Sequence, residues 1–142
     1  MTRKDVSILL VDDDKVDMMA MRRSFRDLKI ENPVFEAGNG IEALCHLRGE
    51  HGYPKVPQPC LVLLDLNMPR MSGIEFLQEL RGDPSLHRIT VFVMTTSAAE
   101  EDLDRAYDKH VAGYLLKQQT GRSFHDAIRM LKCYWQSIEF PN

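Results

Sequence analysis

The sequence has few of the features that mark membrane, secreted or nucleic-acid-binding proteins. None of its apolar runs approaches the roughly 18 residues that a membrane-spanning helix needs. The first residues lead directly into a short apolar segment and not into a signal peptide with a cleavage site. The net charge of the 142 residues is only −3, without a basic stripe, which argues against nucleic acid as a partner. We therefore expect a cytoplasmic protein that contacts neither membrane nor nucleic acid.

Cysteine is scarce and irregularly spaced. Cys45, Cys60 and Cys133 lie far apart, and no Cys-x-x-Cys pair occurs. This pattern predicts three buried, reduced thiols and not a disulfide or a metal–thiolate site. The five histidines show no metal-ligand spacing, and the chain lacks both a Gly-rich phosphate loop and a His-Glu-x-x-His motif. No motif for nucleotide binding or zinc chemistry is therefore present.

What the chain does contain is a regular alternation of two kinds of segment. Five apolar runs, expected as strands, alternate with amphipathic segments expected as helices; the runs are Val6–Val11, Pro33–Ala37, the run that ends at Asp65, Ile89–Met94 and Ala112–Leu116. The length suits one domain, residues 1–142, with no effector domain. The alternation predicts an α/β fold with helices on both faces of a parallel sheet. We expect the flavodoxin-like (βα)5 arrangement, a doubly wound five-stranded sheet in the order 2-1-3-4-5.

Several helices carry signals for where they begin. Asp14 is expected to cap a helix whose apolar stripe is Met18, Met21, Phe25 and Leu28. Asn39, Ser72 and Ser97 each stand three residues before a glutamate, as in a capping box. The final helix is expected to begin near Ser123, with an apolar stripe at Phe124, Ile128, Leu131, Trp135 and Ile138.

Polar residues follow the apolar runs at the points where four of the strands end. They are Asp12 and Asp13, Asp65, Thr95 and Lys117. The run before Asp65 has no polar alternation, which is typical of a strand buried on both faces. Because ligands of open α/β sheets bind at the carboxyl ends of the strands, we expect these side chains to converge on one site.

The residue types at this edge fit phosphoryl chemistry on a carboxylate. Carboxylates held close together repel one another and call for a hard cation such as Mg²⁺. The expected metal ligands are Asp12, Asp13, Asp65 and the backbone carbonyl of Asn67. Asp65, already an anion, would attack phosphorus in line without a general base.

Further groups would complete the phosphate site. Lys117 would place a positive charge on the phosphoryl oxygens, and Thr95 would donate its hydroxyl. The backbone amides of Leu66, Asn67 and Thr96 would complete the phosphate cradle.

With these residues the chain resembles the receiver domains of two-component response regulators, of the chemotaxis-regulator type. The matching segments, within a resemblance from Val6 to about Ile138, are Ile8-Leu9-Leu10-Val11-Asp12-Asp13, Leu63-Leu64-Asp65-Leu66-Asn67-Met68-Pro69-Arg70-Met71-Ser72-Gly73, Thr95 and Gly113-Tyr114-Leu115-Leu116-Lys117. The resemblance implies phosphoryl transfer from the phosphohistidine of a sensor histidine kinase to Asp65. It also implies that Thr95 and Tyr114 move together as a switch.

Two further features refine the resemblance. Gln118 follows Lys117 where the family usually has proline, so the loop that aims the lysine is expected to differ in shape. The proline-rich loop of residues 51–59 and the long last helix are similar to those of single-domain regulators that partner bacterial phytochrome kinases, which implies a homodimer through the last helix and strand. Trp135 and Phe140 are expected either at that dimer face or in the core.

Two other functions compete with the signalling module. A phosphatase with an aspartyl nucleophile typically has a second aspartate two residues on as general acid, and Asn67 stands there instead. The second is a receiver-like scaffold that works without phosphate. We expect no enzymatic activity beyond the gain and loss of the protein's own phosphoryl group.

Overall fold

Strands and helices alternate along the chain in the computed structural model, which describes residues 6–66, 68, 71–95, 100–116, 121–137 and 140. The strands are β1 (Ser7–Val11), β2 (Val34–Ala37), β3 (Cys60–Leu64), β4 (Thr90–Thr95) and β5 (Gly113–Leu116). The helices are α1 (Lys15–Asp27), α2 (Gly40–Arg48), α3 (Gly73–Gly82), α4 (Glu100–Asp108) and α5 (Gly121–Ser137). All neighbouring strands are parallel, in the order β2-β1-β3-β4-β5, which confirms the flavodoxin-like sheet.

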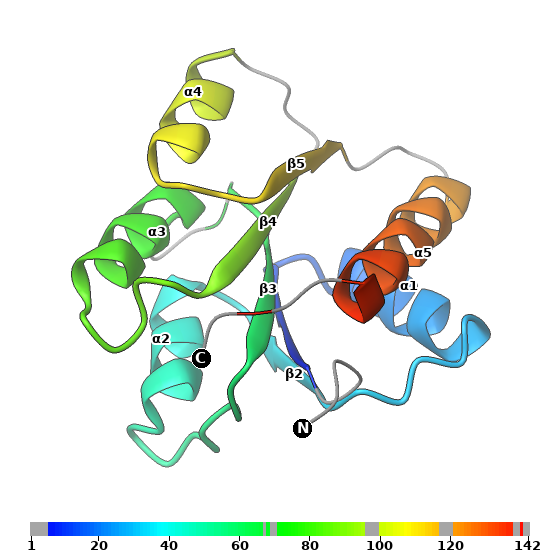
Figure 1. Ribbon diagram of the computed structural model, residues 1–142, viewed down its shortest axis with the longest axis horizontal. Coiled ribbons are helices and arrows are strands. Elements are labelled where there is room, and N and C mark those ends of the chain that lie inside the picture. The colour runs from blue at the N-terminus through cyan, green and yellow to red at the C-terminus, as the bar shows by residue number, and fades with distance from the viewer. Residues whose placement is uncertain are drawn as a thin grey trace.

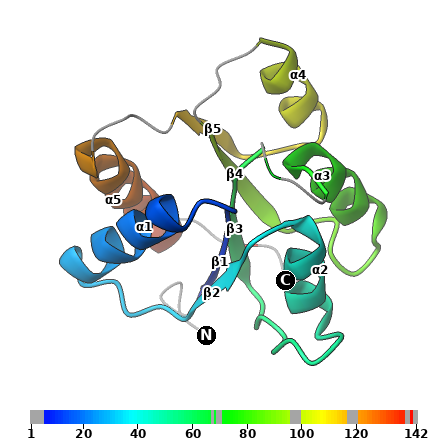
Figure 2. The ribbon, with the colours of Figure 1, turned by 180° about the vertical axis from the view of Figure 1, so that it is seen from behind.

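Helices cover both faces of this sheet. Helices α1 and α5 lie on one face, and α2, α3 and α4 lie on the other (Figures 1 and 2). Side chains of β3 alternate between the two resulting cores: Leu61 and Leu63 join the core under α1 and α5, while Val62 and Leu64 join the other. All four are at most 1% exposed, so the apolar run is buried on both faces as expected. Each such side chain contributes about 1.5–3 kcal/mol to folding by leaving water.

Helix starts follow the predicted caps, with one difference. The Asp14 carboxylate accepts hydrogen bonds from the amides of Val16 and Asp17, and α1 begins there. Ser72 and Glu75 form a reciprocal capping box at α3, with bonds of 3.0 and 3.3 Å.

At α2 the predicted reciprocal box is wrong in its second half. Asn39 accepts from the Glu42 amide at 2.9 Å, but Glu42 reaches back to the amide of Gly38 at 3.1 Å. The two caps differ in φ, which is −162° at Asn39 and −63° at Ser72, and the glutamate of α2 binds the amide one residue before the cap. The box expected at Ser97 lies outside the described residues.

The apolar stripes of α1 and α5 face the sheet. Met18, Met21 and Phe25 are buried as predicted, whereas Leu28 is the half-buried residue that ends α1. On α5, Trp135 is 1% exposed and belongs to the core between α5 and the sheet. Its side chain is therefore a core contact and not part of a dimer face. Phe140 packs on the ring of Tyr134, with centroids 6.0 Å apart.

The thiols differ from the prediction at one position. Cys45 and Cys60 are buried and reduced, as expected, but Cys133 is exposed. Two residues separate by about 200° on a helix, so Cys133 faces away from the core side that Leu131 occupies. Burial raises the pKa of the Cys60 thiol to about 12. Within the described residues, no helix is long and apolar enough to cross a bilayer.

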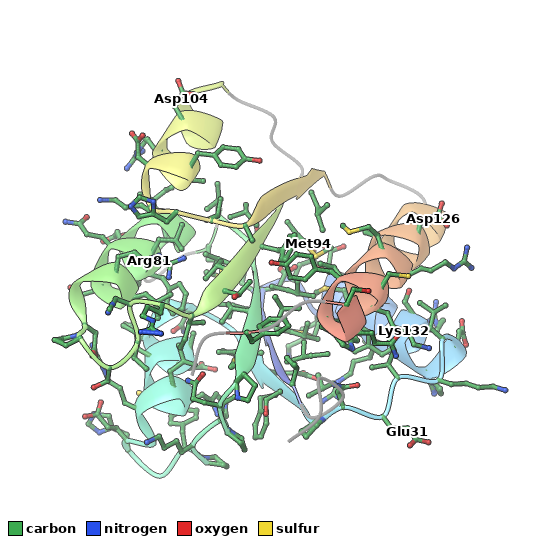
Figure 3. All side chains as sticks on the ribbon, in the orientation of Figure 1. Glu31, Arg81, Met94, Asp104, Asp126 and Lys132 are labelled. Atoms are coloured by element: carbon green, nitrogen blue, oxygen red, sulfur yellow. The ribbon has the colours of Figure 1, made fainter. Side chains whose placement is uncertain are left out.

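The end of α3 is tied to the neighbouring loops by a single guanidinium. Arg81 donates to the carbonyls of His87 and Ile89 before β4, and to those of Lys109 and His110 before β5, at 2.7–2.9 Å (Figure 3). Four of its five N–H groups are thereby used. This side chain connects α3 to both loops at the amino edge of the sheet.

We predict that Arg81→Met lowers the free energy of unfolding by about 3 kcal/mol, because four carbonyls, of which those of Lys109 and Ile89 are in part-buried hydrogen bonds, lose a charged donor. Urea unfolding at neutral pH measures this change. Arg88→Met is the matched control, since Arg88 is exposed on the same loop, and it should change the free energy by less than about 0.5 kcal/mol. A loss below about 1 kcal/mol for Arg81→Met would contradict the assignment.

Candidate acidic site at the carboxyl edge of the sheet

Three carboxylates meet where β1 and β3 end. The two strands are adjacent and parallel, with Val11 paired to Leu64, so the residues that follow them emerge side by side. The ligand oxygens of Asp12, Asp13 and Asp65 all lie within 4.8 Å of one another. The structure therefore brings together the three acidic residues that the sequence analysis proposed as metal ligands.

Backbone hydrogen bonds fix the positions of these carboxylates. The amide of Asp65 donates to the carbonyl of Val11 at 2.9 Å, and the amide of Asp12 donates to that of Ala37 at 3.0 Å. The amide of Asp14 donates to an Asp12 carboxylate oxygen at 2.9 Å. The three consecutive aspartates thus differ in role, because Asp12 and Asp13 point into the cluster and Asp14 caps α1.

Burial makes the cluster electrostatically costly. Asp12 and Asp65 are 4% and 7% exposed, while Asp13 is exposed. Two unit charges about 5 Å apart repel by about 1 kcal/mol in bulk water, and more strongly where protein replaces water. An all-oxygen, strongly anionic donor set of this kind fits a hard divalent cation such as Mg²⁺.

A glycine at the start of α3, whose role the sequence does not predict, allows the helix to approach the site. A Cβ atom on Gly73 would lie 2.6 Å from both the carbonyl oxygen of Asp65 and the Cα of Leu66. The Gly73 amide donates to the Leu66 carbonyl at 3.0 Å. A glycine directly after the Ser72 cap was the only available signal for this contact.

The other predicted site residues are described only in part. Thr95 is the last residue of β4 and pairs with Leu116, and Tyr114 in β5 pairs with Val93, but neither side chain is among those described. Leu66 is 3% exposed and belongs to the core on the α2–α3 face. Three further predicted positions lie outside the described residues: Asn67, Thr96 and Lys117, together with Gln118.

A doubly wound parallel sheet with an acidic cluster at its switch point defines the class of protein, and comparisons with known proteins identify the family. A family model described as the response regulator receiver domain matches residues 8–129. The response regulator Rcp1 of Synechocystis sp. is 34% identical over 135 residues, covering 94% of this chain and 92% of Rcp1.

Solved structures agree with this match. The phosphorylated cyanobacterial phytochrome response regulator RcpA is 33% identical with a TM-score of 0.88, covering 96% of this chain and 99% of that chain. The Mn²⁺-bound form of Rcp1 is 32% identical with a TM-score of 0.86 and the same coverage. The chain belongs to the response regulator receiver domain family, whose members are signalling modules of two-component systems.

We predict that Asp13→Asn raises the free energy of unfolding by about 1 kcal/mol when divalent cations are chelated, because one of three mutually repelling charges is removed. Urea unfolding in the presence of a chelator measures the effect. The same variant should gain less stability from added Mg²⁺ than wild type does.

The control is Glu31→Gln, an exposed carboxylate in the loop between α1 and β2, before β2 begins (Figure 3). An Asp13→Asn variant that is no more stable than Glu31→Gln under chelation would show that repulsion is not the dominant interaction.

Proposed function

We propose that Asp65 is the phosphoryl acceptor of this receiver domain, supplied by the phosphohistidine of a sensor histidine kinase. The convergence of Asp12 and Asp13 on Asp65 supports this assignment more than any other observation. In the proposed site, Mg²⁺ is held by these three carboxylates and the backbone carbonyl of Asn67. When bound, the ion neutralises the carboxylates and the phosphoryl oxygens.

The transfer uses the chain's own groups in defined roles. A carboxylate oxygen of Asp65 attacks phosphorus, and the phosphorus–nitrogen bond to the kinase histidine breaks as the acyl phosphate forms. Lys117 and the Thr95 hydroxyl stabilise the phosphoryl oxygens, as do the backbone amides of Leu66, Asn67 and Thr96. The identity of Asn67, which offers no carboxylic acid at that position, favours a signalling module over a phosphatase.

The output in this proposal is a change in protein contacts. The phosphoryl group draws Thr95 toward it, and Tyr114 turns inward with it, which changes the surface formed by α4, β5 and α5. We propose that residues 1–142 act as one receiver domain without a DNA-binding partner. The similarity to RcpA, a phytochrome response regulator, supports a kinase partner of the phytochrome class. Three free thiols support a cytoplasmic setting.

We also propose a homodimer through α5 and β5. Trp135 is buried, so the interface must use the outer side of α5, where Met130 is 43% exposed. In the described sheet β5 pairs with β4 alone, which leaves its other edge available to a second copy.

The first test is phosphorylation by acetyl phosphate with Mg²⁺, read by intact mass on wild type and on Asp65→Asn. We expect wild type to gain one phosphoryl group, and the variant to gain none because its amide is not a nucleophile. Sizing of both samples shows whether phosphorylation changes the dimer. If wild type binds Mg²⁺ but stays unmodified, the scaffold function replaces this proposal.

The second test separates phosphorylation from its consequence. Thr95→Ala should still accept phosphate but lose about 1 kcal/mol of the coupling between phosphorylation and dimer affinity. Sedimentation of phosphorylated and unphosphorylated protein gives that coupling. Thr90→Ala, at the opposite end of β4, is the control and should keep the wild-type ratio. An unchanged ratio in Thr95→Ala would remove the threonine from the switch.

A further inference from the structure

The loop between β3 and α3 starts at Asp65 and is held by buried apolar side chains. Leu66 and Met68 are 3% and 8% exposed and belong to the core on the α2–α3 face. Met71 packs against the same core. The position of the proposed phosphoryl acceptor therefore depends on how these side chains pack in the core.

The backbone of Met71 has an unusual conformation. Its φ is +69°, in the left-handed region that a side chain with a Cβ atom adopts at an energetic cost. Such a conformation persists where the surrounding structure determines it. The contact that meets Met71 comes from α2, an element more than thirty residues earlier in the chain.

Gly40, the first residue of α2, is the point of contact. A Cβ atom there would lie 2.7 Å from the Cγ and 2.9 Å from the Sδ of Met71, and 3.1 Å from its carbonyl oxygen. The two side-chain distances are shorter than real contacts allow, so Met71 would have to move. The carbonyl distance would also require the backbone to shift by a few tenths of an ångström.

The displaced backbone leads directly to the site. Gly73, two residues after Met71, lies against the Asp65 carbonyl and the Leu66 Cα, and its amide binds the Leu66 carbonyl at 3.0 Å. The backbones are in close contact here, because a Cβ atom on Gly73 would lie only 2.6 Å from either atom. A shift at Met71 is therefore passed to the residues that carry the acceptor carboxylate.

We infer that Gly40 is a positioning residue for Asp65. Because it has no side chain, it leaves the space that Met71 occupies and thereby fixes the β3–α3 loop around the phosphorylation site. This inference rests on the proposed function. It assigns to the α2 amino terminus, which contributes no group to the site, an effect on the rate of phosphoryl transfer. A misplacement of reacting groups by about 1 Å can cost about 100-fold in rate, so a shift of a few tenths should cost about three- to tenfold.

A double-mutant cycle tests the inference. The four proteins are wild type, Gly40→Ala, Met71→Ala and the double variant, and the readouts are the rate of phosphorylation by acetyl phosphate at saturating Mg²⁺ and the affinity for Mg²⁺ alone. We expect Gly40→Ala to slow the reaction about three- to tenfold in the wild-type background. In the Met71→Ala background, where the Cγ and Sδ atoms are gone, the same change should slow it less than about twofold.

Gly82→Ala is the matched control. Gly82 is the last residue of α3, and a Cβ atom there would meet nothing within 4 Å. Its rate should equal that of wild type. All rates are measured below the unfolding transition of each variant, so that a mere loss of stability does not affect them.

The outcomes separate this inference from the proposed function. A wild-type protein that gains no phosphate refutes the function, whereas a phosphorylated wild type matched by a folded Gly40→Ala of equal rate refutes the positioning role. Equal slowing in both backgrounds also refutes it, because the effect would then not pass through Met71. If Gly40→Ala does not fold, Met71→Ala alone decides. Slowing of about threefold or more supports the positioning role of the Gly40–Met71 contact, and a wild-type rate overturns it.

Discussion

The parallel pairing of β1 with β3 is the constraint on which the rest of this structure depends. Val11 and Leu64 are partners in the central ladder, and each is followed by an aspartate. The pairing of the two strands therefore places Asp12 beside Asp65. A slip of one residue would exchange the leucines and valines of β3 between two close-packed cores, so side-chain packing holds the register that creates the acidic cluster.

The cluster opposes folding while the cores around it favour folding. Like charges on three carboxylates within 4.8 Å of one another repel, and two of the carboxylates are nearly excluded from water. The strands behind them are among the most deeply buried segments of the described chain. The carboxylates are held close together because they directly follow these buried strands, and their all-oxygen donor set fits a divalent cation.

Sequence pattern predicted most of the fold because the relevant signals are local. The unbroken apolar run before Asp65, the aspartate cap of α1 and the Ser72 capping box depend only on neighbouring residues, and each was found where expected. Alternation of strands and helices then restricts the topology to a few arrangements. The convergence of Asp12, Asp13 and Asp65 followed from where their strands end.

What the pattern missed depends on atoms brought together from distant segments. The acceptors of Arg81 are backbone carbonyls, which leave no trace in the sequence. The need for glycine at positions 40 and 73 comes from close approaches that appear only in three dimensions. The exposure of Cys133 followed from helix phase, but it was obscured by the assumption that free thiols are buried. The side chains of Thr95 and Tyr114 remain a matter of prediction.

The exposed thiol of Cys133 gives this protein a natural site for selective chemical labelling. Cys60 is buried and, with its pKa near 12, is held as the unreactive thiol at neutral pH. Cys133 stands in solvent on α5, the same helix whose opposite side carries Trp135 in the core. A maleimide dye would therefore attach preferentially to the helix proposed to carry the signal, without any engineered residue, and the indole across that helix would serve as its fluorescence partner.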